Sequence, residues 1–420
     1  MRTVIMPKNP FLLLLIFCLL ASCKLRKLYD ETTIGHENFS STIQFQRLSS
    51  GHIVVPVIIK NKEYSFLVDT GTPNIISKEL PETLELEHVS HKKYMDSQDN
   101  TLELSLAEID QIKIGGIAFN KNATIIHDFE KSPPTIRCLN IAGVIGANLM
   151  KRAIWQFDFE QDEIVISDSK KYRKNSNTNI LKFVTGYSGT PIVKVDINGI
   201  SDGKAYVDFG AIGFYKSSKR TFKRLCKESV KDQCKTTSGY GSMASGAFGY
   251  EEPDSSYIAL VHAFSLGSND PAKLTNQLIT LSNHSDKLIG LEFFENYLTT
   301  INWKDKELAL TKRTNEHKIL TYNSFGFKVV YKDNKLYIGF IYQNSPASKS
   351  GLEIGDQISK INQFDFDQST EDQFCKFQNS NILDTATELT LSITRDGKVL
   401  DFNLKQVDLF GSRAMSISKD

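Results

Sequence analysis

The chain has 420 residues, of which 40% are hydrophobic and 24% are charged, a composition typical of folded globular domains and not of disordered proteins. Its 50 basic and 49 acidic residues are interspersed and leave a formal charge of +1, which argues against a nucleic-acid partner. The length accommodates three compact units and a short connecting segment.

Residues 1–22 predict an export signal, because basic residues precede an apolar run at 11–20 that is too short to span a membrane comfortably. The run leads into the letters LASC at 20–23, which resemble a bacterial lipobox. The resemblance implies cleavage before Cys23 and lipidation of this residue; an uncleaved signal anchor is the alternative. We therefore expect a lipid-anchored protein of the cell envelope, on the outer membrane or periplasmic face of a Gram-negative bacterium, with residues 23–44 as a tether.

A short phrase then occurs twice: residues 66–72 read Phe-Leu-Val-Asp-Thr-Gly-Thr, and residues 205–211 read Ala-Tyr-Val-Asp-Phe-Gly-Ala. Each is an apolar run of strand length that delivers an aspartate, Asp69 or Asp208, into a turn containing glycine. One such turn is a common way to leave a strand, so a single copy would indicate little. Two copies indicate an internal repeat.

Further landmarks surround both phrases in the same order. An apolar strand precedes each phrase, an apolar segment that ends in glycine follows it, and an aromatic-rich strand pair comes next. In the two copies these landmarks lie at 55–59 and 190–195, at 143–146 and 288–290, and at 155–166 and 300–310. We therefore predict a mainly β protein with duplicated lobes at 45–172 and 173–312.

The order of these landmarks resembles the pepsin and retropepsin superfamily of aspartic peptidases, over about residues 45–312. The resemblance implies two β-barrel lobes whose aspartates, Asp69 and Asp208, meet at the lobe interface. It also implies that Gly146 and Gly290 belong to segments that cross behind them. Two carboxyl groups this close share one proton, so one acts as a base on a water molecule while the other donates to the peptide carbonyl. The implied activity is endopeptidase cleavage of extended polypeptides without a metal or other cofactor.

The residues beside the aspartates are carried over from the same resemblance. Gly71 and Gly210 would let the backbone turn closely beneath the carboxylates. Thr70 would brace the pair by a hydrogen bond to the other lobe, whereas Phe209 at the matching position cannot return that bond. If Phe209 displaced Asp208 from the cleft, the same fold would be a non-catalytic peptide-binding scaffold or receptor, which is the alternative function.

Peptidases of this class cover the bound substrate with a β-hairpin flap. Residues 94–104 are the candidate in the first lobe, and the glycine-rich residues 236–246 are the candidate in the second, unless they form only a surface loop. A serine or cysteine peptidase is not indicated, because the chain has no Gly-x-Ser-x-Gly elbow.

A polar stretch at 312–318 marks a domain boundary, which places a third domain at 318–410 and a tail at 411–420. The Ser-Phe-Gly-Phe sequence at 324–327 opens this domain. Pro-Ala, Gly-Leu and Gly-Asp-x-Ile follow within 346–358. This series resembles an α+β PDZ domain.

The PDZ resemblance implies that the backbone amides of Phe325, Gly326 and Phe327 hold the C-terminal carboxylate of a peptide ligand or partner. The ligand would add a strand along a groove whose other wall is a helix at 370–378. Such a domain would recruit substrate to the lobes or gate their cleft. The alternative is a domain that only packs on the lobes and binds no free peptide.

Four cysteines remain beyond the signal and the proposed lipidation site. Cys226 and Cys234 enclose a short loop and are the predicted disulfide, whereas Cys138 and Cys375 lie in different predicted domains and are expected to stay free. The histidines lack the spacing of metal ligands, so no metal site is predicted.

Overall fold

The computed structural model describes residues 27–86, 88–170, 174–228, 235–267, 273–283, 286–313, 321–367 and 370–411. The predicted export signal, the lipidation site Cys23, the disulfide partner Cys234 and residues 412–420 of the predicted tail lie outside the described residues. Within the described part of the chain, no helix is both long enough and apolar enough to cross a membrane.

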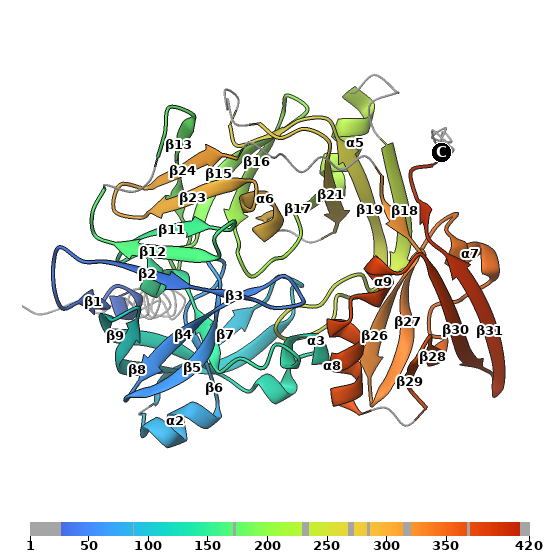
Figure 1. The fold of residues 1–420 in the computed structure, drawn as a ribbon, viewed down its shortest axis with the longest axis horizontal. Coiled ribbons are helices and arrows are strands. Elements are labelled where there is room, and N and C mark those ends of the chain that lie inside the picture. Colours follow the sequence, from blue (N-terminus) through green and yellow to red (C-terminus); the bar gives the residue numbers. More distant parts are fainter. Residues whose placement is uncertain are drawn as a thin grey trace, which may run out of the picture.

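The first lobe, blue to green in Figure 1, is built on a nine-stranded sheet in the order β1-β9-β6-β10-β5-β4-β8-β7, with β3 paired to β4. Its strands are β1 (Thr33–Ile34), β3 (Gln46–Arg47), β4 (Ile53–Ile59), β5 (Lys62–Val68), β6 (Ile75–Ser77), β7 (His88–Met95), β8 (Thr101–Ile114), β9 (Ile117–His127) and β10 (Gly143–Ile145). Its helices are α2 (Glu79–Leu84), η1 (Phe129–Lys131), α3 (Pro134–Arg137) and α4 (Ala147–Met150). Buried and exposed residues alternate from Val55 to Ile59, as expected for a strand with one face on the core.

The second lobe repeats this plan in the order β14-β15-β16-β22-β17-β21-β19-β18, with β20 paired to β15. Its strands are β14 (Val184–Thr185), β15 (Pro191–Ile197), β16 (Ile200–Val207), β17 (Tyr215–Ser218), β18 (Lys235–Gly241), β19 (Asp254–Val261), β20 (Phe264–Ser265), β21 (Gln277–Ser282) and β22 (Leu288–Ile289). Its helices are α5 (Lys219–Glu228) and α6 (Leu291–Phe294). In both lobes, the strand that leads to an aspartate has a short parallel neighbour, β10 beside β5 and β22 beside β16.

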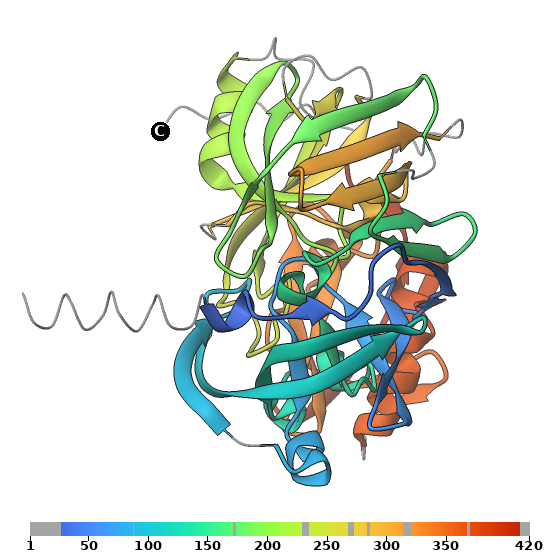
Figure 2. The ribbon, with the colours of Figure 1, turned by 90° about the vertical axis from the view of Figure 1, so that its left-hand side faces the viewer.

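A six-stranded sheet in the order β13-β24-β23-β11-β12-β2 joins the two lobes. Its strands are β2 (Ser40–Gln44), β11 (Ile154–Asp158), β12 (Glu163–Ser167), β13 (Thr178–Lys182), β23 (Tyr297–Asn302) and β24 (Glu307–Lys312). Strand β11 of the first lobe pairs along its whole length with β23 of the second, and one apolar core runs through both lobes. Figure 2 shows the two lobes stacked one above the other.

Residues 23–44, predicted to be a tether, contain two strands, β1 and β2. Strand β2 pairs with β12 over its whole length, and β1 pairs with β9. Four of the five residues of β2 are polar, and Ile43 is the one buried position of the strand. The sequence pattern therefore did not indicate a strand. Residues 33–44 therefore belong largely to the folded lobes.

The third domain has its own apolar core and lies beside both lobes at the lower right of Figure 1. Its elements are β25 (Asn323–Ser324), β26 (Phe327–Lys332), β27 (Lys335–Tyr342), α7 (Pro346–Ser350), β28 (Gln357–Ile361), β29 (Phe364–Asp365), α8 (Glu371–Asn379), α9 (Ile382–Thr385), β30 (Glu388–Arg395), β31 (Lys398–Lys405) and β32 (Val407–Asp408). Strand β27 pairs with β18, so the sheet of the second lobe continues into this domain. Helix α8 is the groove helix predicted at 370–378. It begins with a capping box formed by Thr370 and Gln373.

A disulfide bond joins Cys138 and Cys375, so the expectation that these thiols stay free is wrong. Cys138 ends α3 of the first lobe, and Cys375 lies in α8 of the third domain. The two helices pack together, which brings the Cα atoms of the cysteines to 5.3 Å although 237 residues separate them. The sequence did not predict that Cys138 and Cys375 are paired, because their proximity depends on how the third domain docks on the first lobe.

Candidate active site

Asp69 and Asp208 occupy equivalent positions, each directly after the strand that leads to it. The backbone N–H of Asp69 donates to the carbonyl of Ile145 at 3.0 Å, and that of Asp208 donates to the carbonyl of Ile289 at 3.0 Å. The short strands β10 and β22 thus hold both aspartates from behind. This is the relation that the repeated order of landmarks predicted.

The two glycine turns place the aspartates against each other. The carboxylate of each aspartate lies against the glycine of the opposite turn. A Cβ atom on Gly71 would lie 2.6 Å from the carboxylate of Asp208, and one on Gly210 would collide with the carboxylate of Asp69. Each turn therefore needs a glycine because the carboxylate of the opposite lobe lies directly against its backbone.

Backbone amides orient both carboxyl groups. The N–H of Gly71 donates to Oδ1 of Asp69 at 2.6 Å, and the N–H of Gly210 donates to Oδ1 of Asp208 at 3.0 Å. Burial raises the pKa of both aspartates, and the neighbouring charge of Asp69 raises the pKa of Asp208 further. The pKa of Asp208 is therefore raised further than that of Asp69.

Thr70 makes the predicted brace between the lobes. Its buried hydroxyl donates to the carbonyl of Val207 at 2.7 Å and accepts from the N–H of Phe209 at 3.1 Å. One side chain of the first lobe therefore fixes the backbone on both sides of Asp208.

Phe209 does not displace Asp208. Its fully buried ring packs against Phe157, with the ring centroids 4.7 Å apart, and against Phe294 at 4.9 Å. Phe157 belongs to the first lobe and Phe294 to the second. Apolar packing of Phe209 across the interface thus replaces the second hydrogen bond that a hydroxyl at this position would make.

His52 is a further contact of the second turn that the sequence did not reveal. Its Nε2 lies 3.1 Å from the carbonyl oxygen of Gly210, and its Nδ1 lies 2.9 Å from the hydroxyl of Ser50. Burial lowers the pKa of His52, so the ring is neutral and donates from Nε2 to the carbonyl. A lone histidine before β4 carries no sequence signal for this role.

The glycine segments behind the aspartates fit against backbone. A Cβ atom on Gly146 would collide with the backbone at Asn74, and one on Gly290 would collide with the carbonyl of Gly213. Asn74 also accepts a hydrogen bond at Oδ1 from the N–H of Gly146 at 2.8 Å. Sequence reasoning found both glycines and missed Asn74, because an asparagine beside a turn is common.

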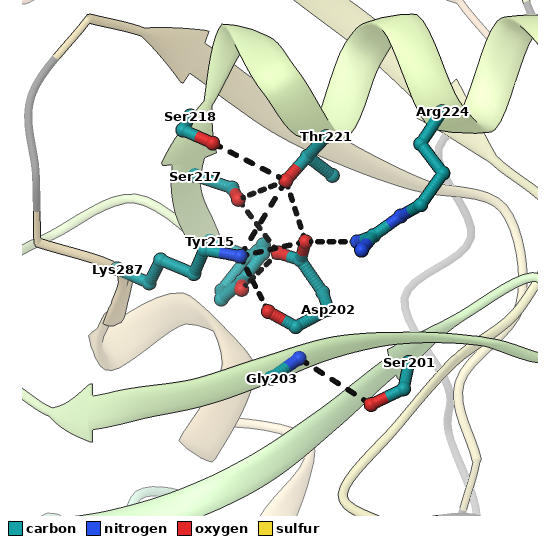
Figure 3. Close-up of polar contacts among 9 residues, drawn as sticks. All are labelled: Ser201, Asp202, Gly203, Tyr215, Ser217, Ser218, Thr221, Arg224 and Lys287. Carbon is teal, nitrogen blue, oxygen red and sulfur yellow. Dashed lines mark hydrogen bonds and ion pairs between the residues drawn. The ribbon is translucent and has the colours of Figure 1, made fainter.

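A buried network supports the strand that carries Asp208 (Figure 3). Asp202 of β16 accepts hydrogen bonds from the hydroxyls of Tyr215 and Ser217, each at 2.6 Å, and from Thr221. Lys287 and Arg224 form ion pairs with the same carboxylate at 2.7 and 2.6 Å. Although burial opposes ionisation, these donors lower the pKa of Asp202 below its usual value, so the network ties β16 to β17 and α5.

The predicted flap of the first lobe is the hairpin β7–β8, and residues 94–98 near its tip line the cleft. Oδ1 of Asp96 accepts from the N–H groups of Gln98 and Asn100, both at 2.9 Å, and holds the turn. Lys216 of β17 donates from Nζ to the carbonyl of Ser97 at 3.3 Å and to Oε1 of Gln98 at 3.0 Å. The tip is thereby attached to the second lobe.

The second flap candidate, 236–246, consists of most of β18 and the start of a loop. We call residues 243–251 the roof loop. The N–H of Phe248 donates to Oδ2 of Asp96 at 2.8 Å, and the hydroxyl of Ser132 donates to the carbonyl of Ala247 at 2.7 Å. The roof loop therefore reaches from the second lobe across the cleft to the flap and to the first lobe.

Beneath this cover, the cleft holds a cavity of about 570 Å³ that Asp69 and Asp208 both line. Much of its wall on the side of the first lobe is apolar, made by Leu67, Ile75, Leu104, Ile125 and Val144. Within the described residues, no group of three or more His, Cys, Asp or Glu side chains is placed to hold a metal ion.

The third-domain loop predicted to bind a carboxylate is formed around Gly326, which has a φ of 92°. The rings of Phe325 and Phe327 are buried in the domain core, so their side chains are not available to a ligand. A Cβ atom on Gly326 would collide with Ser345. The requirement for glycine at this position is therefore both conformational and steric.

Comparison with known proteins identifies two classes of domain in this chain. Residues 55–149 match the family model described as aspartyl protease, and residues 315–393 match the PDZ domain. The first match contains Asp69 and Gly146 and ends before the second lobe. No curated protein gives a significant match. The protein therefore combines an aspartyl protease domain and a PDZ domain in a mainly β fold.

Proposed function

We propose that the protein is a lipid-anchored aspartic endopeptidase of the cell envelope that hydrolyses extended polypeptides. The observation that carries the proposal is the close approach of Asp69 and Asp208, each of which lies against the glycine of the opposite turn and lines the same cavity. The lipid anchor and location rest on the lipobox-like sequence that ends at Cys23. The aspartyl protease match over the first lobe supports the proposed chemistry.

In the proposed reaction, ionised Asp69 accepts a proton from a water molecule placed between the carboxyl groups. The resulting hydroxide attacks the peptide carbonyl carbon, while the proton of Asp208 passes to the carbonyl oxygen. The C–N bond of the tetrahedral intermediate then breaks as the proton held by Asp69 passes to the leaving amine. One hydroxyl proton of the intermediate returns to Asp208, which leaves a carboxylic acid product and restores both aspartates. The contrast between the two pKa values supplies one base and one acid at the same pH.

The rest of the site supports binding of an extended chain. The flap and the roof loop cover the cleft, which limits water around the reacting groups. The apolar wall of the first lobe suits an apolar side chain next to the cleaved bond.

The test is cleavage of a diverse peptide pool across a pH series by the purified full chain, beside Asp69→Asn and Asp208→Asn. Asp110→Asn is the matched control, because Asp110 is an exposed residue of β8. We expect specific cuts from the parent and from Asp110→Asn, and loss of more than about a thousandfold in rate in either cleft variant. No cutting by the parent at any pH would favour the non-catalytic peptide-binding scaffold.

A further inference from the structure

The groove of the PDZ domain faces the peptidase lobes. Its helical wall, α8, packs on α3 and is attached there by the disulfide between Cys138 and Cys375. Arg137 donates from Nε to Glu371 at the start of α8 at 2.6 Å, and Gln378 near the end of α8 donates to the carbonyl of Thr135. One wall of the predicted peptide groove is therefore held against the first lobe.

The other wall of the groove is the edge of β26, and Tyr250 of the roof loop reaches it. Among the described strands, β26 pairs with β27, which leaves its opposite edge toward the groove. The hydroxyl of Tyr250 accepts from the N–H of Tyr331 at 3.3 Å and donates to the carbonyl of Tyr331 at 3.2 Å. A peptide added as a strand to this edge would use the same two backbone groups.

The same loop covers the candidate active site. A bridge between Ser245 and Tyr250 closes the roof loop on itself, and the carbonyl of Tyr250 accepts from Nδ2 of Asn100 in the flap tip at 3.4 Å. Phe248 is bonded to Asp96 of the same tip. A displacement of Tyr250 from β26 would therefore act directly on the cover of the cleft.

We propose that the PDZ groove is a regulatory site for a peptide with a free C-terminal carboxylate, and that this peptide and Tyr250 compete for the edge of β26. A bound peptide removes Tyr250 from Tyr331 and loosens the roof loop, which opens the cleft. The catalytic consequence rests on the proposed peptidase function, whereas the competition itself does not.

The position of Tyr331 makes the competition depend on peptide length. A carboxylate at Phe325, Gly326 and Phe327 places the last residues of a peptide opposite the beginning of β26. Residues of two paired strands lie opposite one another one by one. A peptide whose C-terminus lies at residues 325–327 therefore needs about five residues to reach Tyr331. We therefore expect a three-residue peptide to bind without displacing Tyr250 and an eight-residue peptide to displace it.

Binding is tested with the full chain carrying Asp69→Asn, which keeps the probes intact. The probes are fluorescent pools of random three-residue and eight-residue peptides with free carboxylates, and the same pools with amidated ends. We expect Tyr250→Phe to bind the eight-residue pool about three- to tenfold more tightly and the three-residue pool unchanged. Amide exchange at Tyr331 should be faster in Tyr250→Phe.

The matched control is Tyr322→Phe, which removes a tyrosine hydroxyl bonded to Tyr342 inside the PDZ domain and away from the edge of β26. It should leave binding of both pools unchanged. Equal binding of the eight-residue pool by Tyr250→Phe and its parent, equal gains for both pool lengths, or no binding of either pool would each overturn the competition.

The effect on the cleft is measured with the catalytic parent and a quenched substrate with an amidated end. The eight-residue pool with free carboxylates should raise the cleavage rate at least threefold over the amidated pool, which controls for competition in the cleft. An unchanged rate would overturn the coupling to the roof loop. Competition in the binding assay with no cleavage by the parent under any condition would instead reject the peptidase function and support the shared edge.

Discussion

Phe209 occupies a position where the resemblance expects a hydroxyl, and restoring that hydroxyl should harm the protein. Phe209→Thr would allow a second hydrogen bond between the lobes, worth about 0.5–1.5 kcal/mol. It would also remove a fully buried ring that contacts Phe157 and Phe294. Truncation of a buried phenylalanine costs about 3–5 kcal/mol, so we expect a net loss of about 1.5–4.5 kcal/mol in the free energy of unfolding.

The assay is denaturant unfolding of the parent and Phe209→Thr, followed by tryptophan fluorescence. Trp155 stacks near Phe157 in the same core and should report the change. Phe402→Thr is the control, because Phe402 is half-buried at the margin of the PDZ core and should lose less stability. A Phe209→Thr variant as stable as the parent would refute the view that apolar packing replaces the second brace.

Four further changes test other parts of the structure. Burial lowers the pKa of His127 to about 4, so the free energy of unfolding should fall by up to about 1.4 kcal/mol per unit as pH drops from about 6.5 to about 4. His127→Gln should reduce the difference in the free energy of unfolding between pH 4.5 and pH 7, measured by denaturant unfolding. An unchanged difference would contradict the attribution of this pH dependence to His127. Lys216→Met removes the contact with the flap tip and should raise KM by about tenfold, measured by peptide cleavage; an unchanged KM would contradict the attachment. His52→Phe should lower kcat about three- to tenfold with little change in KM, whereas equal effects on both would indicate a role in binding. Replacing Cys138 and Cys375 together by serine should cost about 2–5 kcal/mol in denaturant unfolding, and no loss would show that the domains dock equally well without the bond.

The features that sequence reasoning found are those with local signals. The turns at Asp69 and Asp208 were found because each combines an apolar strand, an aspartate and a glycine over a few residues. The segments ending in Gly146 and Gly290 were found because they recur in order, and the structure places them behind the aspartates. Local chemistry and repetition were sufficient for these features.

The features that sequence reasoning missed depend on docking between distant segments. His52 contacts Gly210 only because the hairpin before β4 meets the second lobe. Cys138 meets Cys375, and Tyr250 meets Tyr331, only because the PDZ domain packs on both lobes. No local pattern distinguishes these residues from other histidines, cysteines and tyrosines.

The pairing of β18 with β27 has a consequence for experiments that divide the chain. In the described structure, Gly239, Tyr240 and Gly241 of β18 lie opposite residues of β27. Removal of the PDZ domain would expose the backbone donors and acceptors of this strand as a bare edge, where chains tend to associate. Loss of activity after truncation would then reflect self-association as readily as a missing regulator, so single substitutions such as Tyr250→Phe are the more informative experiments.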